Sequence, residues 1–469
     1  MKKATPTKTI VKNVIPLSTF CLLFFTSVVF AQHAVSTHAG SSQGYTDATG
    51  TAAKFKAPTG ICISPDGSFL YVADYSGHRI RKINVATKAV TTVAGNGVSG
   101  YTDASGSSAV FSYPSGICIS GDGSVLYVSD YGNSRIRKID LSNQAVTTIA
   151  GNGNFSYSDN VNGLSASFNS PTDVVNDHDS ILYISDTENH LIRKFNISTS
   201  EVSTLAGMAG IAGFQNGAGT NAAFRFPKGM AVSSDGLTLY VADNGNNMIR
   251  AISLLNKNVT TIAGDGTAGY ADNITGAMAK FSAPNGVSIT PGDPTTLYVA
   301  DNGNHRIRKI STLTTQVSTI AGNGAVPPAS TFADNATGIN ARFFYPTNLI
   351  LSPDAMNIYV ADQGNFRVRK IQTDLSTGET NTISSELDCE VFPNPVSGQL
   401  SIRFPSGFSA DKMEFYDQAG RLVITEDRLT SGNSGLLTKD LSALPVGSYF
   451  LKISNGDKII SRKIILFAK

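Results

Sequence analysis

Pairs of an aromatic residue and an acid, two positions apart, recur along the chain and are its most regular candidates for chemistry. A carboxylate can hold a cation, and an aromatic ring can stack on the flat face of a sugar. The pairs are Tyr45 and Asp47, Tyr101 and Asp103, Tyr157 and Asp159, Tyr270 and Asp272, and Phe332 and Asp334, with Phe214 and Asn216 as a variant. Gathered on one face of the protein, they would form a ligand-binding ring.

The same pairs also have a structural interpretation. Each aromatic ring would fill the seam between two structural units, and each Asp would cap its own glycine-rich turn. The pairs return in repeat after repeat, whereas a binding site tends to break the symmetry of a repeated scaffold. This regularity favours the structural interpretation, and both interpretations stay open on the sequence alone.

Histidine occupies one equivalent turn position in three repeats, at His78, His190 and His305. Zinc needs bonds of ~2 Å, which alternate repeats of a ring lie too far apart to supply together. We therefore expect these histidines to be surface turn residues. His178, in the sequence Asp-His-Asp, is the one local metal-like cluster, and a solvated turn is its favoured interpretation.

Motifs for nucleophiles and cofactors do not occur in the sequence, which has no Gly-x-Ser-x-Gly, phosphate loop, His-Glu-x-x-His or paired-Cys zinc pattern. Cys62 and Cys118 share a slot that later repeats fill with Val, Ala, Ser and Ile, so we expect buried, packed thiols. The residues thus assign no catalytic group and no metal ligand, and they leave the cofactor unknown.

An internal repeat supplies the elements that position these residues. An aspartate after a Leu-Tyr-Val-Ala-like run recurs every 56 to 61 residues, at Asp74, Asp130, Asp186, Asp243, Asp301 and Asp362. An Arg-Ile-Arg-Lys-Ile-like segment follows each one, with its central arginine at Arg81, Arg137, Arg193, Arg250, Arg308 and Arg369. Alternation in this segment predicts buried isoleucines and cations that reach water. We also expect the Asp and the Arg of each repeat to bond across their short hairpin.

Each repeat is typical of four short strands, because Val, Ile, Tyr and Thr fill the segments and Gly, Asn, Asp and Pro separate them. A four-stranded sheet repeated radially is a blade of a β-propeller. Six copies predict an all-β protein with a six-bladed β-propeller. The segment 34–40 resembles the end of a repeat and precedes the first full copy, so it should pair into the last blade as its outer strand and close the ring.

The phrases Pro-x-Gly-Ile, Leu-Tyr-Val-Ala-Asp and Gly-Asn-His-Arg-Ile-Arg-Lys-Ile (303–310) resemble the NHL repeat over about residues 34–383. The resemblance implies a platform that binds protein, RNA or glycan. A minority of related propellers are lyases or lactonase-like hydrolases with metal ligands in the central channel, and no matching constellation stands in this sequence.

The C-terminal segment departs from the repeat and predicts a small β-sandwich of alternating strands and glycine turns. Pro-Asn-Pro (393–395), Tyr-Asp-x-x-Gly-Arg (416–421) and Leu-Pro-x-Gly-x-Tyr (444–449) occur in order. Together they resemble the type A sorting domain of the type IX secretion system. The resemblance implies that the secretion machinery is a partner and that the protein crosses the outer membrane of a Bacteroidota-type bacterium.

The N-terminal segment is typical of a secretory signal, with four lysines, an apolar run and small residues before a predicted cut between Ala31 and Gln32. The run from 14 to 30 is shorter than the ~20 residues of a spanning helix, and Pro16 and Ser18 interrupt it, so we expect no transmembrane anchor after cleavage. The sequence therefore predicts a signal peptide over 1–31, a propeller over 32–385 and a sorting domain over 386–469.

The charge balance of the chain argues against nucleic acid as a partner. Without the four lysines of 1–31, the 37 basic residues become 33 against 35 acidic ones, which gives no basic footprint for nucleic acid. We expect a secreted or outer-membrane-surface module that binds glycan or protein, with specificity in the irregular loops 208–221 and 325–340. The alternative is a metal-dependent lyase or hydrolase in the central channel, where Asp173 and Asn348 are the polar departures from Gly.

Overall fold

The computed structural model describes residues 33–325 and 332–373 and, towards the C-terminus, 390–392, 398–403, 409–416, 422–430, 436–445, 447–455 and 458–466. The predicted signal peptide 1–31 and its cut between Ala31 and Gln32 lie outside the described residues, as does the predicted domain boundary at 385. In the described part of the chain, no helix is long and apolar enough to cross a membrane.

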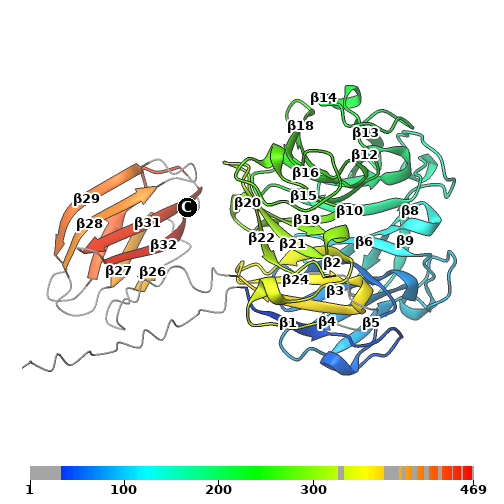
Figure 1. Cartoon of the computed structure of the whole chain (residues 1–469), viewed down its shortest axis with the longest axis horizontal. Coiled ribbons are helices and arrows are strands. Elements are labelled where there is room, and N and C mark those ends of the chain that lie inside the picture. The colour runs from blue at the N-terminus through cyan, green and yellow to red at the C-terminus, as the bar shows by residue number, and fades with distance from the viewer. Residues whose placement is uncertain are drawn as a thin grey trace, which may run out of the picture. The chain divides into compact units, whose positions relative to one another are not determined.

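The described residues between 35 and 372 form the six-bladed β-propeller that the sequence predicts, with its blades in chain order from blue through green to yellow in Figure 1. Each blade is an antiparallel sheet of four strands given from the innermost outwards. Blades 1 to 3 are β2 (Pro58–Ile63), β3 (Phe69–Asp74), β4 (Arg79–Asn84) and β5 (Val90–Ala94); β6 (Pro114–Ile119), β7 (Val125–Asp130), β8 (Arg135–Asp140) and β9 (Val146–Ala150); and β10 (Pro171–Asp177), β11 (Ile181–Asp186), β12 (Leu191–Asn196) and β13 (Val202–Ala206).

Blades 4 to 6 repeat this plan, with an extra edge strand in blade 4 and with a fourth strand in blade 6 that comes from the start of the propeller sequence. They are β15 (Pro227–Val232), β16 (Thr238–Asp243), β17 (Met248–Ser253) and β18 (Asn258–Ala263), edged by β14 (Gly217–Ala218); β19 (Pro284–Thr290), β20 (Asp293–Asp301), β21 (Arg306–Ser311) and β22 (Val317–Ala321); and β23 (Pro346–Leu351), β24 (Asn357–Asp362), β25 (Arg367–Gln372) and β1 (Val35–Ala39). The predicted ring closure is confirmed, because β1 pairs with β25 antiparallel, Val35 opposite Ile371.

Short 3-10 helices occupy two recurring places. After the second strand of each blade come η2 (Tyr75–Gly77), η4 (Tyr131–Asn133), η6 (Thr187–Asn189), η8 (Asn244–Asn246), η10 (Asn302–Asn304) and η12 (Gln363–Asn365). The loops between blades hold η1 (Gly50–Ala52), η3 (Gly106–Ser108), η5 (Gly163–Ser165), η7 (Gly219–Asn221), η9 (Gly276–Met278) and η11 (Gly338–Asn340).

The propeller core is divided among the seams between neighbouring blades, which explains why the second strands are apolar at consecutive positions. In β3, Tyr71 and Ala73 belong to the cluster shared with blade 2, whereas Leu70 and Val72 belong to the cluster shared with blade 6. Successive side chains of a strand point to opposite faces, and here both faces are covered by another sheet. A Leu-Tyr-Val-Ala run is therefore the pattern that a blade between two blades requires.

The innermost strands approach each other closely at their N-terminal ends. A Cβ added at Gly60 of β2 would collide with the backbone carbonyl of Ser115 in the next blade, and one added at Gly229 of β15 would collide with that of Asn285. Glycine is required there because backbone meets backbone. This level forms the narrow throat of the central channel.

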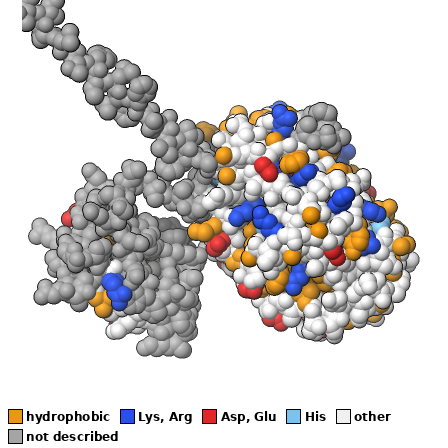
Figure 2. Space-filling view, turned by 90° about the horizontal axis from the view of Figure 1, so that it is seen from below, with side chains coloured by type: hydrophobic (Ala, Val, Ile, Leu, Met, Phe, Trp, Pro, Cys, Tyr) orange, Lys and Arg blue, Asp and Glu red, His pale blue; other side chains and the backbone are white. Residues whose placement is uncertain are grey.

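The C-terminal domain has the predicted β-sandwich architecture. One sheet contains β26 (Glu390–Phe392), β27 (Gln399–Arg403) and β30 (Leu436–Asp440), and the other contains β28 (Ser409–Tyr416), β29 (Leu422–Thr430), β31 (Gly447–Asn455) and β32 (Lys458–Leu466). Leu400 and Ile402 of the first sheet share a core with Met413, Phe415 and Leu451 of the second. On the face of the protein seen in Figure 2, charged and hydrophobic side chains are scattered over the propeller and form no continuous area of one type.

Candidate functional site

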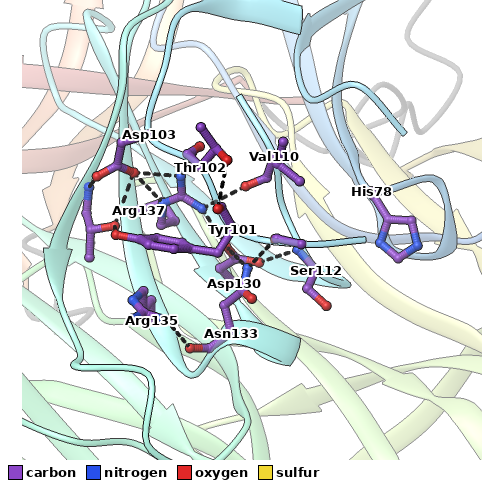
Figure 3. A network of polar contacts seen from close by, with 12 residues as sticks. His78, Tyr101, Thr102, Asp103, Val110, Ser112, Asp130, Asn133, Arg135 and Arg137 are labelled. Carbon is purple, nitrogen blue, oxygen red and sulfur yellow. Dashed lines mark hydrogen bonds and ion pairs between the residues drawn. The ribbon is translucent and has the colours of Figure 1, made fainter. Parts of the chain in front are cut away.

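The aromatic and acid pairs lie at the outer rim of the propeller, each beside the outermost strand of its own blade. In blade 2, Asp103 accepts from the Thr148 amide of β9 at 2.9 Å and from the Arg137 guanidinium at 2.7 Å. Tyr101 covers that guanidinium, with its ring centroid 5.0 Å away, and Phe111 lies at 4.9 Å from it. Figure 3 shows this network, in which Arg137 is the centre.

Arg137 is fully buried, so the expectation that the repeated arginines reach water is wrong. Its Nη1 atom donates to Asp130 at 2.6 Å and to the Val110 carbonyl, its Nη2 atom donates to the Thr102 carbonyl, and its Nε atom donates to Asp103. The strand pattern resembles that of an exposed edge, but the loop from the preceding blade folds over this face of β8 and supplies the acceptors. The predicted bond between the Asp and the Arg of each hairpin is confirmed here.

The network returns in every blade with small departures. The rim ion pairs are Asp47 with Arg81, Asp103 with Arg137, Asp159 with Arg193, Asp272 with Arg308 and Asp334 with Arg369, at 2.6 to 2.7 Å. Blade 4 uses Asn216, which accepts from Arg250 at 2.8 Å. In blade 1 the inner pair of Asp74 and Arg81 is longer, at 3.6 Å, and Gly77 stands where other blades place an Asn that donates to the Asp.

These contacts revise the structural interpretation of the pairs. Asp103 does not cap its own turn, because it joins the buried arginine to the outermost strand. Tyr45 and Tyr101 do not fill a seam, because their side chains are 43% and 44% exposed and lie on arginines. The pairs stand one to a blade and are not brought together in a cavity, and their part in ligand binding stays a prediction.

The three equivalent histidines are buried connectors between blades, so the expectation that they are surface turn residues is wrong. His78, His190 and His305 are 9%, 8% and 3% exposed. The Nδ1 atom of each accepts from a backbone amide of the next blade, at 3.1 to 3.2 Å: His78 from Tyr113, His190 from Phe226 and His305 from Tyr345. Burial lowers the pKa of all three imidazoles.

A cavity of about 480 Å³ opens at one end of the central channel and is lined by residues of all six blades. We call it the mouth cavity. Two positions of each blade supply most of its variable wall. One position is the first residue after the second strand, and in blades 1 to 6 it holds Tyr75, Tyr131, Thr187, Asn244, Asn302 and Gln363. All of these except Asn302 line the cavity. The other position is the second residue of the innermost strand, and in blades 1 to 6 it holds Thr59, Ser115, Thr172, Lys228, Asn285 and Thr347, which all line the cavity.

The side of the mouth cavity formed by blades 1 and 2 is aromatic. The rings of Tyr75 and Tyr131 lie 5.8 Å apart between centroids, and Tyr113 lies 4.9 Å from Tyr75. Burial raises the pKa of Tyr75 to about 12, so its hydroxyl stays protonated at neutral pH. The two rings that line the cavity can therefore stack on a flat ligand face, and their hydroxyls can donate to it.

The side formed by blades 3 and 4 is charged. Glu188, which is exposed, and Lys228, which is half-buried, line it together with Phe226. Burial lowers the pKa of Lys228, and the charge of Glu188 acts in the opposite direction. Asn244 donates to the Pro284 carbonyl of the next blade, so this amide also holds two blades together.

Asp173 and Asn348 stand at the throat, where the other four blades have glycine. They belong to blades 3 and 6, which are opposite each other in a six-membered ring, and both line the mouth cavity and a second cavity of about 230 Å³ below it. Asp173 is 5% exposed and accepts from the Met230 amide at 2.9 Å. Burial outweighs this bond and raises the pKa of Asp173 to about 7.

The mouth cavity thus combines aromatic rings, amides, hydroxyls and both charges, which suits a ligand with hydroxyl groups and a flat apolar face. Sequence reasoning identified Asp173 and Asn348 but missed Tyr75, Tyr131 and Lys228. The signal was available in the position after each repeated Asp, which changes from blade to blade. Among the described residues, no three His, Cys, Asp or Glu side chains gather to hold a metal ion.

The remaining predicted positions are scattered. His178 is a solvated turn residue, 70% exposed and paired with Asp177 at 2.6 Å. Cys62 is buried in the seam between blades 1 and 2, as expected of a packed thiol, whereas Cys118 is only partly buried, contrary to the expectation. The loop 208–221 lies at the rim of blade 4, where β14 pairs with β18, and Phe214 is 67% exposed. In the loop 325–340, residues 326–331 lie outside the described residues.

Comparisons with known proteins agree with the architecture. Residues 111–139 match the family model "NHL repeat", and residues 390–467 match "Secretion system C-terminal sorting domain". The chain contains a six-bladed β-propeller, and the match to the NHL repeat lies in its second blade. Its C-terminal domain is a type IX sorting domain, which implies the type IX secretion machinery as a partner and a place at the cell surface or outside the cell.

Curated relatives match more than half of the chain. NHL repeat-containing protein 2 of Homo sapiens is 29% identical over 311 residues, covering 60% of this chain and 42% of that protein. Protein SUPPRESSOR OF QUENCHING 1 of Arabidopsis thaliana is 26% identical over 418 residues, covering 86% of this chain and 37% of that protein. The chain therefore spans less than half the length of these relatives.

Solved structures share the fold. An auxiliary nutrient binding protein from Bacteroides thetaiotaomicron superposes with a TM-score of 0.55 at 16% identity, covering 72% of this chain and 76% of that one. A protein of unknown function from the same organism gives a TM-score of 0.54 at 22% identity, with the same coverage of each chain.

Proposed function

We propose that the propeller is the binding module of this exported protein and that it takes a glycan or protein ligand at the mouth cavity. One observation carries the proposal. The wall of the mouth cavity changes around the ring, with tyrosines on one side and Glu188 and Lys228 on another, whereas the rim network is nearly identical in all six blades. A scaffold repeats its contacts, and a site breaks them.

The size of the cavity favours a glycan over the face of a folded protein. A volume of about 480 Å³ falls within the ~300–1,000 Å³ of small-molecule sites. A stable protein interface covers ~800 Å² on each partner and needs a broader surface than this opening. A solved protein of the same fold is described as nutrient-binding, which is in line with the proposal. That likeness is one of fold and names no ligand.

The test is binding of the purified exported protein to an oligosaccharide array and to a protein panel, followed by calorimetry on the strongest binder. Tyr131→Ala removes a ring from the mouth cavity, and Tyr101→Ala removes a ring of similar chemistry from the rim. We expect Tyr131→Ala to weaken binding by at least tenfold, which is about 1.4 kcal/mol, and Tyr101→Ala to leave it within twofold. The reverse pattern would move the site to the rim pairs, and no binding to either panel would overturn the proposal.

A hydrolase or lyase in the channel is the second candidate, and Asp173 is the observation that favours it. A carboxyl group whose pKa is about 7 can donate or accept a proton at neutral pH, as a general acid or base must. The test is product release from any bound saccharide by the wild type and by Asp173→Asn. Turnover that disappears in the variant while binding persists would establish the enzyme, and binding without turnover would reject it.

A further inference from the structure

The mouth cavity is a pit with walls on every side. Its lining comes from all six blades, with Asn285 as the residue from blade 5, so the described residues close a ring around its floor and leave an extended polymer no groove across it. An elongated ligand can enter such a pit only with one end or with the end of a branch. Grooves that bind the middle of a chain have two open ends, and the ring provides none at this level.

The floor of the pit lies at the throat. The glycines of four blades bring backbone against backbone there, as the collision at Gly60 with Ser115 shows. The other two blades place Asp173 and Asn348 at this level. Below them the second cavity is lined mainly by residues with apolar side chains, of which Ile63, Ile119 and Ile350 are partly exposed. A hydroxylated ligand is therefore expected to stop at the carboxyl and the amide, because deeper entry would leave its hydroxyl groups without partners.

The chemistry of floor and walls suits one sugar ring. Asp173 and Asn348 can accept from hydroxyl groups, and the amide of Asn348 can also donate. Tyr75 and Tyr131 belong to blades 1 and 2, and Lys228 belongs to blade 4, on the other side of the ring. A pyranose standing on the floor would have an aromatic wall against one face and a polar wall against the other.

We propose that the mouth cavity recognises the terminal sugar of a glycan end-on, with its outermost hydroxyl groups against Asp173 and Asn348. This inference rests on the proposed glycan binding at the same cavity and adds which part of the glycan is bound. The protein is then a reader of chain ends, so its occupancy follows the number of ends and not the total mass of polysaccharide.

The first experiment measures the affinity of the full exported protein for malto-, cello-, manno- and xylo-oligosaccharides of two to six residues by calorimetry. We expect the affinity for the preferred series to change by less than twofold beyond three residues. Methylation of the non-reducing terminal sugar, or reduction of the reducing end to an alditol, should weaken binding at least tenfold for whichever end enters the pit.

The second experiment uses Asp173→Gly and Asn348→Gly, which install the residue of the other four blades and so fit the local backbone. We expect each to weaken binding at least tenfold while the unfolding temperature stays at or above that of the wild type. Leu255→Ala, at an exposed hairpin of blade 4, is the control and should bind as the wild type does.

The outcomes separate the two proposals. Affinity that rises steadily from two to six residues and ignores both end modifications would overturn end-on recognition while leaving glycan binding in place. Unchanged binding by Asp173→Gly and Asn348→Gly would do the same. If no oligosaccharide in any series binds, glycan recognition itself fails, and end recognition fails with it.

Discussion

The rim and the mouth of this propeller are built from the same repeat, but the rim keeps the same residues in nearly every blade and the mouth does not. At the rim, Arg137 is fully buried and satisfied by two carboxylates and two carbonyls, and its five counterparts do nearly the same. At the mouth, the residue after each repeated Asp is Tyr in blades 1 and 2, Thr in blade 3 and an amide in the others. Sixfold recurrence therefore identifies contacts that hold blades together, and its loss identifies positions that are free for a ligand.

The rim and the throat also differ in how their buried charges are paired. The arginines at the rim are balanced locally, because each has at least one acidic partner within 3.6 Å. At the throat, Asp173 has a backbone amide as its partner at 2.9 Å, and no salt bridge joins it to another described residue. A buried carboxyl that meets no cation shifts its pKa upwards, which occurs at this position. The paired charges of the rim stabilise the fold. The buried carboxyl of Asp173 destabilises it when ionised, and a ligand that bonds to this carboxyl can reduce that destabilisation.

Replacing the central arginine of a blade should give the largest effect on stability. Arg137→Met keeps an unbranched apolar stem but removes the guanidinium, so Asp130 stays buried without its cation. Breaking a buried pair from one side costs about 3–5 kcal/mol. We expect a loss of this size in the free energy of unfolding measured by urea denaturation.

Arg135→Met is the matched control, since Arg135 lies on the same strand, is only partly buried and donates to two backbone carbonyls. It should cost about 1 kcal/mol. Equal losses in the two variants would contradict the view that burial of the paired charge distinguishes the rim network.

A substitution at the throat should raise the free energy of unfolding, whereas Arg137→Met at the rim lowers it. The pKa of Asp173 is raised to about 7 in the folded chain from 3.8, so the folded state holds the proton more tightly than the unfolded state does. Stability is therefore lost as pH rises from about 4 to about 7. Asp173→Asn cannot ionise and so avoids this loss. A pKa shift of about three units at ~1.4 kcal/mol each sets ~4 kcal/mol as the upper value for the gain in the free energy of unfolding at high pH.

The measurement is urea unfolding of the wild type and Asp173→Asn at pH 4 and pH 8. We expect the variant to be the more stable protein at pH 8 and to lose that advantage at pH 4. A variant that is less stable than the wild type at pH 8 would show that the carboxylate is stabilised in the throat, contrary to the geometry.

The sequence predicted the ring because its evidence is periodic. Recurrence of Asp74 and its counterparts revealed six blades, and the segment 34–40 revealed the closing strand. Burial of Arg137 could not be predicted in the same way, because its acceptors come from Asp103 and from loop carbonyls that are distant in sequence. The alternating pattern of β8 is compatible with a solvated strand, and only the loop that folds over it decides the matter.

The histidines teach the same lesson. His78 stands in a Gly-His turn that is typical of a surface, and its Nδ1 acceptor role appears only when blade 2 is placed beside blade 1. Tyr131 was hidden for another reason. It directly follows the repeated Asp, and a search for constant residues passes over this variable position. Its role in the cavity is indicated by the change of residue type between blades, since the same position holds Asn244 in blade 4 and Gln363 in blade 6.

The seams between blades should show a modest sensitivity to acid. Folding lowers the pKa of His78, so the unfolded state binds the proton more readily, and stability is lost as pH falls below about 6.5 towards the folded pKa. His78→Asn replaces the imidazole by the amide that blade 4 already uses, where Asn247 accepts from Ala283 at 2.9 Å. We expect a change of about 1 kcal/mol or less at pH 8, as for one hydrogen bond.

Thermal unfolding of the wild type and His78→Asn between pH 5 and pH 8 checks this. The decline in unfolding temperature below pH 6.5 should be smaller in the variant, and smaller again when His190 and His305 are also changed to Asn. Parallel pH profiles would exclude the histidines as the source of acid sensitivity.

The smallest effect should follow from changing a rim carboxylate, which separates the rim from the mouth most finely. Asp103→Asn keeps an acceptor for Arg137, as Asn216 does for Arg250 at 2.8 Å in blade 4. The Asp103 side chain is 36% exposed, so its ion pair is worth ~1 kcal/mol or less. We expect urea unfolding to show a loss of that size and ligand affinity to stay within twofold of the wild type. A loss of affinity with stability intact would instead make the aromatic and acid pairs of the rim a binding site, and it would reverse the roles that the two regions have here.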